Sequence, residues 1–192
     1  MAAPYSERQA RSYKMGENRP EPGSVQVTQA DPGHALLIQN LVQLYTHDFS
    51  EFWAGTSRGE LDSDGRFSAY PLEEYWSRAN WWAGLIWCDR KLAGFALIND
   101  ETHSGLPADR NMGEFFIVRK HRGGGVGRVA AEILFSMQAG SWELAVARKN
   151  TGALQFWRKV IRSSPNASAT EELDVQTSRW NGAILRFDWG IM

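Results

Sequence analysis

The sequence has a single cysteine, Cys88, and none of its apolar runs approaches the ~20 residues of a transmembrane helix. A lone cysteine excludes an internal disulfide framework and a cysteine-cluster zinc site, so we expect no metal site. The formal net charge of -1 gives no overall field that would attract nucleic acid or an acidic membrane. The first residues lack the apolar stretch of a signal peptide. We therefore expect a cytoplasmic protein with neither a nucleic-acid nor a membrane partner.

Length and composition predict one globular domain. The chain has 192 residues, of which 43% are hydrophobic and 22% are charged, and this is enough for a sizeable core. Residues 1–23 are polar and rich in proline, glycine and charge, which predicts a flexible N-terminal arm. Residues 24–192 are then the domain. Its nine tryptophans and the apolar ends of the expected sheet are compatible with a homodimer.

Hydrophobic periodicity predicts strands and helices in the order β-α-α-β-β-β-α-β-α-β. Asp31 followed by Pro32 is typical of a helix start, and apolar residues recur at helical spacing from there to about residue 49. The apolar runs 82–88 and 92–98 are separated by three polar residues, which predicts a hairpin. The other expected strands are 24–30, 113–119, 142–148 and 183–189, the other helices are about 71–80, 126–140 and a segment capped by Asn150, and the loops are 54–70, 99–111 and 163–168.

The most informative stretch is RKHRGGGVGR, residues 119–128, which lies between an expected strand and an expected helix. The first turn of a helix has unpaired N–H groups and a partial positive charge. Glycines let several N–H groups converge and let an anion approach closely. The stretch therefore predicts a pyrophosphate site. Its expected members are Arg122, Gly123, Gly124, Gly125, Val126, Gly127 and Arg128.

Three phosphate-binding motifs compete for this stretch. The Walker pattern fails because Arg128-Val129 stands where Lys-Ser/Thr is needed. The dinucleotide fingerprint G-x-G-x-x-G/A matches residues 125–130, but it needs an acid at the end of the next strand, where the sequence has the basic pair Arg148-Lys149. The pattern R/Q-x-x-G-x-G/A is satisfied by residues 122–127.

That third pattern resembles the acyl-coenzyme A motif of the GNAT acetyltransferase superfamily. The resemblance covers roughly residues 24–189 and is most specific over 113–160, where AVARKNTGALQFWRKV is similar to the family's next strand and helix. It implies an α/β (α+β) fold, with a central mixed and mostly antiparallel sheet that is flanked by helices and has a splayed central strand. Residues 24–192 would then form a single N-acetyltransferase domain.

The resemblance also implies a reaction and a binding mode. A primary amine of a small molecule would attack acetyl-coenzyme A (acetyl-CoA) directly, with acetyl-CoA as co-substrate and no metal. Ile117 and Val118 on the splayed strand would pair with the pantetheine arm, and a backbone N–H near Val118 would stabilise the oxyanion. Asn150 and Trp157 would lie against the pantetheine. Asn150 is also predicted to cap its helix.

Glu114 is the residue that we expect to act as general base, because the substrate ammonium must lose a proton before it can attack. It lies beside Phe115 and Phe116, where partial desolvation raises the pKa of a carboxyl. The weaker candidates for this role are His47, Asp48 and Glu143. The acids expected on the substrate side, which would suit a cationic acceptor, are Asp48, Glu51, Glu60, Asp62 and Asp64.

The sequence departs from the family pattern at Trp157, where many relatives have a tyrosine that protonates the departing thiolate. An indole cannot supply that proton, so the acid is absent or comes from elsewhere. This departure keeps alternatives open. The chain could acetylate a protein N-terminus or lysine, or it could sense acyl-CoA with weak or no turnover. A dinucleotide-dependent oxidoreductase is a more distant alternative.

Overall fold

A computed structural model describes residues 23–177 and 180–190. The predicted N-terminal arm, residues 1–23, therefore lies outside the described residues except for its last position. Within the described part of the chain, no helix is both long enough and apolar enough to cross a membrane.

Seven strands form one mixed sheet in the order β1-β2-β3-β4-β5-β7-β6. The strands are β1 Val25–Gln29, β2 Trp82–Cys88, β3 Lys91–Asn99, β4 Arg110–Ile117, β5 Gly140–Ala147, β6 Ala167–Gln176 and β7 Asn181–Trp189. Neighbouring strands are antiparallel except β4 and β5, which are parallel. The predicted fold class, a mixed and mostly antiparallel sheet with helices on its faces, is confirmed.

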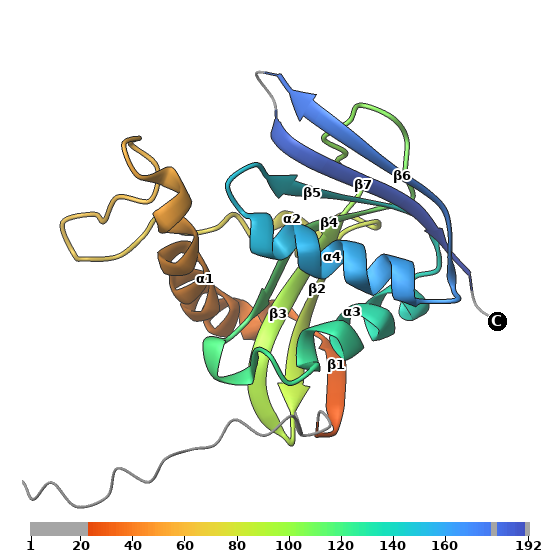
Figure 1. The fold of residues 1–192 in the computed structure, drawn as a ribbon. Helices are drawn as coiled ribbons and strands as arrows, with labels where there is room; N and C mark the ends of the chain where they lie inside the picture. The colour runs from red at the N-terminus through yellow and green to blue at the C-terminus, as the bar shows by residue number, and fades with distance from the viewer. Residues whose placement is uncertain (1–22, 178–179, 191–192) are drawn as a thin grey trace, which may run out of the picture.

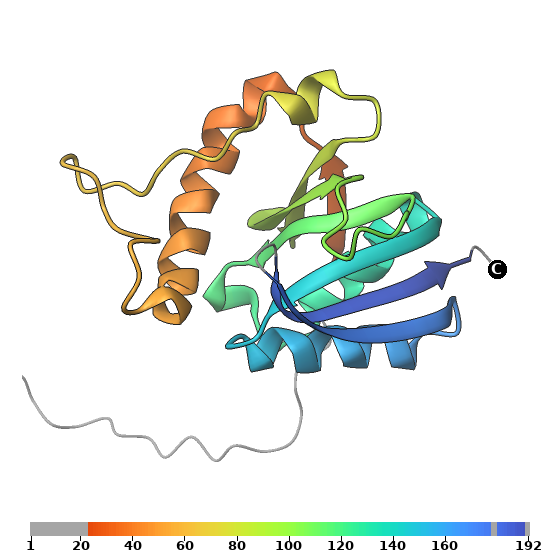
Figure 2. The same ribbon diagram turned by 90° about the horizontal axis from the view of Figure 1, so that it is seen from above.

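Helices cover both faces of the sheet (Figures 1 and 2). α1 (Ala35–Ser50) and the short α2 (Glu74–Ser77) lie on one face, while α3 (Val126–Met137) and α4 (Thr151–Ser163) lie on the other. Three short 3-10 helices, η1 Pro32–His34, η2 Glu51–Trp53 and η3 Arg119–His121, lie before α1, after α1 and after β4. Each face has its own apolar core. Strands β2 and β3 are buried along most of their length and are correspondingly apolar.

Local sequence signals explain where several elements begin and turn. The Asp31 carboxylate accepts a hydrogen bond from the Gly33 N–H at 2.8 Å and so caps the start of the first helical segment, as predicted. The β2–β3 hairpin turns at Asp89 and Arg90, whose φ angles are both positive (50° and 61°). Positive φ at both central residues matches the right-handed twist of the strands.

Strand β6 is missing from the sequence prediction, which ended a loop at residue 168 and assigned nothing to the residues before β7. β6 is the edge strand of the sheet, and nearly all of its side chains are exposed or half-exposed. It therefore lacks the alternation of apolar and polar residues that marks a half-buried strand. β4 also begins earlier than predicted, at Arg110, so that Glu114 lies inside the strand.

The parallel pair β4 and β5 is joined only at its beginning. The register pairs Arg110, Asn111 and Met112 with β5, while the last five residues of β4 have no partner on that side. β4 remains paired with β3 through to its end. The central strand is therefore splayed from β5, as the resemblance implied, and its unpaired edge opens beside the N-termini of α3 and α4.

Candidate functional site

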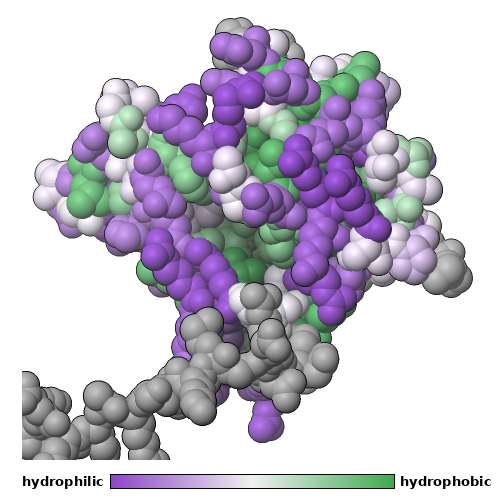
Figure 3. All heavy atoms as spheres, in the orientation of Figure 1, coloured by the Kyte–Doolittle hydropathy of each residue, from purple (hydrophilic) through white to green (hydrophobic). Residues whose placement is uncertain are grey.

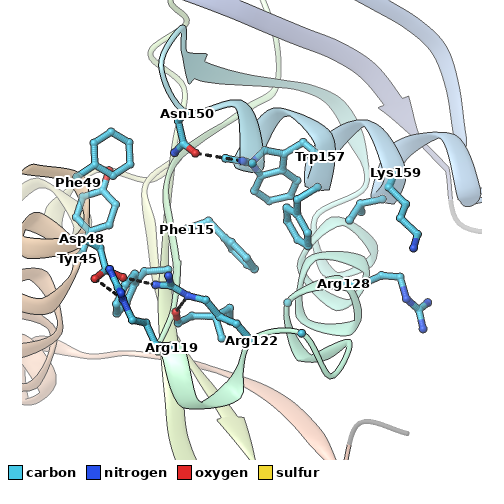
Figure 4. A pocket seen from close by; sticks show the side chains of 18 of the residues that line it. Tyr45, Asp48, Phe49, Phe115, Arg119, Arg122, Arg128, Asn150, Trp157 and Lys159 are labelled. Carbon is cyan, nitrogen blue, oxygen red and sulfur yellow. Dashed lines mark hydrogen bonds and ion pairs between the residues drawn. The ribbon is translucent and has the colours of Figure 1, made fainter. Parts of the chain in front are cut away.

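A cavity of about 590 Å³ lies at the splay between β4 and β5, within the usual size range of small-molecule sites. One wall comes from α1 and η2, and the other from the glycine loop, the start of α3 and α4. Figure 4 shows Tyr45, Asp48 and Phe49 on one side, Asn150, Trp157 and Lys159 on the other, and Phe115 between them. Figure 3 shows a hollow with an apolar floor on the corresponding face of the molecule.

The backbone of β4 offers free donors to this cavity, but Val118 is not one of them. The Val118 N–H donates to the carbonyl oxygen of Ala93 on β3 at 2.8 Å, so the donor expected there is already engaged. Bonded and non-bonded positions alternate along an antiparallel ladder, so the N–H groups of Phe115 and Ile117 point toward the splay. Arg122 Nε donates to the Ile117 carbonyl oxygen at 2.6 Å on that open side. Val118 is therefore not free to be the donor expected there, and the β4 donors that face the cavity side are those of Phe115 and Ile117.

The glycine loop is shaped to present backbone donors. Gly123 and Gly125 have φ angles of 79° and 86°, in the left-handed region that favours glycine. Gly125 is the N-cap of α3, and among the described residues no side chain caps the N–H groups of the first turn. Those donors and the helix dipole therefore remain available to an anion such as a diphosphate. Gly123, Gly125 and Gly127 line the cavity, whereas Gly124 and Val126 do not.

The basic side chains around the loop are less available than the sequence suggested. Arg119 and Arg122 both bind Asp48 on α1, with N–O distances of 2.8 and 2.6 Å. Burial raises the pKa of Asp48, but hydrogen bonds from Arg122 and Arg119 outweigh it and bring the pKa below its ordinary value. Asp48 is thus ionised and occupied, which leaves it unsuited to act as a base. The ion pairs join α1 to the segment that follows β4.

Asn150 and Trp157 lie on the α4 side of the cavity. The Asn150 side-chain oxygen accepts a hydrogen bond from the Ala153 N–H at 3.1 Å, so Asn150 caps α4 as predicted. Trp157 lines the cavity, but the residue is only 6% exposed and its ring packs against Phe115, with the ring centroids 5.0 Å apart. Its position in the core explains why tryptophan is found here. Adding a hydroxyl at this position would bury it among aromatic rings.

The Trp157→Tyr variant should therefore not gain activity. We expect unchanged or lower turnover together with a loss of about 1–3 kcal/mol of stability, because a smaller ring leaves a void and an unpaired hydroxyl. Thermal unfolding and steady-state kinetics measure the two effects. Trp87→Tyr is the matched control, because Trp87 is a half-buried residue of β2 that does not line the cavity. Several-fold faster turnover with an unchanged melting temperature would show that position 157 supplies a catalytic acid when it is tyrosine.

Glu114 lies at the base of the α1 side of the site. Burial raises the pKa of Glu114 to about 7, while hydrogen bonds from Tyr45 and Tyr70 act in the opposite direction. Burial, followed by the Glu114 charge, raises the pKa of both tyrosines, so both hydroxyls stay protonated and donate. Glu114 itself does not reach the cavity wall, whereas Tyr45 does. The Tyr45 hydroxyl therefore lies next to both the Glu114 carboxyl and the cavity.

Tyr45 and Tyr70 were not anticipated from the sequence. Tyr70 comes from the loop expected over 54–70, and two glutamines of α1 hold that loop in place. Gln39 bonds to both backbone groups of Tyr70 (2.5 and 3.0 Å), and Gln43 does the same at Phe67 (3.1 and 2.8 Å). Two glutamines four residues apart lie on one face of a helix, and this spacing was the sequence signal that α1 could hold a neighbouring segment. Their targets could not be read from the sequence.

The other candidates from the sequence have structural roles or lie away from the site. Glu143 is fully buried and forms an ion pair with Arg186 at 2.8 Å. Asp62 uses its carboxylate to cap its own turn through the Asp64 and Arg66 N–H groups, each at 2.9 Å. Besides Glu114, Gly124 and Val126, the candidates from the sequence that do not line the cavity are His47, Glu60, Asp62, Asp64, Val118 and Glu143. Among the described residues, no three His, Cys, Asp or Glu side chains are grouped to hold a metal ion.

Comparison with known proteins gives matches in structure but not in sequence. No protein-family model and no curated protein matches the sequence. An acetyltransferase from Thermus thermophilus superposes with a TM-score of 0.59 at 12% identity, covering 88% of this chain and 97% of the other.

Two further solved structures also superpose on most of the chain. The spermidine N-acetyltransferase from Vibrio cholerae, solved in complex with CoA and spermine, gives a TM-score of 0.54 at 12% identity, covering 86% of this chain and 95% of the other. Ard1 from Thermoplasma volcanium gives a TM-score of 0.51 at 14% identity, with 88% and 99% covered. At such low identity the likeness concerns the fold. The chain has the fold of the GNAT acetyltransferase superfamily.

Proposed function

We propose that this protein is an N-acetyltransferase that moves the acetyl group of acetyl-CoA to a primary amine of a small molecule by direct attack. The observation that carries the proposal is the splay of β4 from β5 beside an uncapped helix N-terminus. The free N–H groups of β4 and the uncapped N–H groups at the start of α3 open into one cavity. That combination suits an extended ligand with a diphosphate at one end and an amide-containing arm.

The donor substrate would lie along this row. The backbone N–H groups at the start of α3 would bind the diphosphate, with Lys159 nearby to contribute charge, whereas the Arg128 guanidinium already pairs with Glu132 at 3.1 Å. The N–H and carbonyl groups of Phe115 and the N–H of Ile117 would pair with the pantetheine arm. Asn150 would add a polar contact on the opposite side. These residues are where we place the expected cofactor contacts, with Ile117 taking over the role expected of Val118.

Glu114 would take the first proton of the reaction. The ammonium of the acceptor must lose a proton before its nitrogen can attack the thioester carbon. A carboxyl with a pKa of about 7 is half-ionised near neutral pH, which suits a general base. Because Tyr45 lies between Glu114 and the cavity, the proton would pass through the Tyr45 hydroxyl.

The same path can supply the proton for the leaving group. When the new C–N bond has formed and the C–S bond breaks, the nitrogen gives up a second proton and the sulfur gains one. Tyr45 is the one hydroxyl among the residues that line the cavity in the described part of the chain. We place the proton transfer to sulfur there, in the absence of a tyrosine at position 157.

Two other activities compete with this proposal: acetylation of proteins, and acyl-CoA sensing without turnover. The occupation of position 157 by a buried tryptophan favours sensing, because it removes the usual acid. The buried Glu114 carboxyl, hydrogen-bonded to the cavity-lining Tyr45, favours catalysis.

Calorimetry with CoA and acetyl-CoA, followed by thiol release with a panel of amines, tests the proposal. We expect binding of both nucleotides and amine-dependent thiol release. Binding without thiol release for any small amine or peptide would leave sensing as the function. Acetylation of peptides but not of small amines would shift the activity to proteins. Failure to bind CoA or acetyl-CoA would contradict the proposed use of the cavity altogether.

A further inference from the structure

The acceptor end of the cavity has an aromatic wall. Tyr45 and Phe49 come from the last turns of α1, Phe52 from η2 and Phe116 from β4. Phe49 lies at the centre, with its ring centroid 5.0 Å from that of Tyr45 and 5.4 Å from that of Phe52. Phe49 and Phe52 are half-exposed, so both offer apolar ring surface to a ligand. Three of these residues lie on the α1 side, and Tyr45 is also the residue that contacts Glu114.

The charges at this end do not match an acceptor with several ammonium groups. Among the residues that line the cavity, the carboxylates are Asp48 and Glu51. Asp48 is held by Arg119 and Arg122, so its charge is already balanced. Glu51 is exposed at the rim. The acids of the following loop, which the sequence suggested for a cationic acceptor, do not reach the cavity.

The site has a negative partner for one ammonium, next to the proposed reaction centre. The Tyr45–Glu114 pair can face a single ammonium, the one that is acetylated. A second or third ammonium would lose its hydration against phenylalanine rings and would lie near two arginines. Among the described residues that line the cavity, the unpaired carboxylate available to balance its charge is Glu51 at the rim. A flat apolar body can instead stack on Phe49 and Phe52, with favourable ring–ring contacts.

From this arrangement, and resting on the proposed transferase function, we infer that the acceptor is a monocationic amine with an aromatic or similarly flat apolar body. The amine nitrogen lies at Tyr45, and the body lies against Phe49 and Phe52. Linear polyamines are poor acceptors. This separates the chain from the spermidine N-acetyltransferase whose fold it shares.

Kinetics with matched amines test the inference. The probes are 2-phenylethylamine, hexylamine as a flexible monocation, and putrescine and spermidine as polycations. We expect kcat/KM for 2-phenylethylamine to exceed that for each polyamine by at least about tenfold, and that for hexylamine to lie between them.

Phe49→Ala should lower kcat/KM for 2-phenylethylamine about tenfold, change that for hexylamine less, and leave CoA affinity unchanged. Leu44→Ala, an exposed position on the same helix, is the matched control and should change neither.

The inference fails if kcat/KM for spermidine or putrescine equals that for 2-phenylethylamine. It also fails if Phe49→Ala lowers kcat/KM for every amine and the affinity for CoA by the same factor. If no amine releases thiol, the transferase proposal fails, and calorimetry of the amines with the CoA-bound protein still tests the acceptor class. Tighter binding of 2-phenylethylamine than of spermidine, weakened by Phe49→Ala, would support it. Equal binding or none would overturn it.

Discussion

Replacing Glu114 with glutamine should lower kcat by about 10²–10⁴-fold, the usual contribution of a general base. In the native enzyme, kcat/KM should rise with pH through an inflection near 7, because burial raises the pKa of Glu114 to about 7 and the ionised form accepts the proton. The Glu114→Gln variant should lose that inflection. Stopped-time assays of thiol release across pH 5–9 measure both effects.

The same substitution should make the protein more stable at alkaline pH. Glu114 has a pKa of about 7 in the folded protein against an ordinary 4.5, so the folded state holds its proton more tightly. The native protein therefore loses stability as pH rises from 4.5 to 7, by roughly 3 kcal/mol at most, and the loss then stays constant. Glutamine carries no charge and avoids this loss. Melting temperatures should favour the variant at pH 8, and the difference should shrink toward pH 4.5.

Two further variants sharpen this prediction. Tyr45→Phe removes a hydrogen bond that lowers the pKa of Glu114, so the inflection should move to higher pH while kcat falls. Glu60→Gln removes an exposed carboxylate that does not line the cavity, so it should leave rate, inflection and melting temperature unchanged. If Glu114→Gln keeps the inflection near 7 and its kcat within about threefold, another group is the base.

Replacing Gly125 with alanine should weaken CoA binding by about tenfold or more. Gly125 has a φ of 86° and is the N-cap of α3. A side chain strains that conformation by about 1–2 kcal/mol. If the backbone relaxes, the N–H groups of the first turn move away from the diphosphate, and each charge-assisted hydrogen bond lost costs about 1.5–3 kcal/mol. Calorimetry with CoA measures the affinity.

Gly105→Ala is the matched control for this loop variant. Gly105 has a φ of 75° and open space around its side-chain position, but it lies in the loop between β3 and β4, away from the cavity. Both variants should lose a similar amount of stability, whereas only Gly125→Ala should lose CoA affinity. Equal CoA affinity in the two variants would show that the donors at the start of α3 do not hold the diphosphate.

The parts of the site that could be predicted from the sequence depend on neighbours along the chain. The glycine loop could be predicted because its N–H donors come from consecutive residues at the start of one helix. The capping role of Asn150 could be predicted because an N-cap side chain accepts a hydrogen bond from an N–H only three residues later. Glu114 was a reasonable candidate because an acid stood among phenylalanines in one strand.

The parts that could not be predicted depend on register and on distant segments. The engagement of Val118 by Ala93 follows from which residues of β4 face β3, and a shift of one residue would reverse it. Tyr70 reaches Glu114 from a loop whose backbone is held by Gln39, 31 positions earlier in the chain. Arg122 was expected to bind phosphate, yet Asp48, 74 residues earlier in the chain, occupies its guanidinium.

Most of the strands and helices, the family resemblance, the glycine loop and the acid on the central strand were determined by the sequence alone, because each depends on periodicity or on adjacent residues, whereas the exposed edge strand β6 was not. Only the tertiary structure decided which strand edge is open, which hydroxyl lies next to both Glu114 and the cavity, which acids are already paired, and which aromatic side chains line the cavity. These features arise where segments far apart in the chain pack together, and the cost and partners of such packing are not encoded locally.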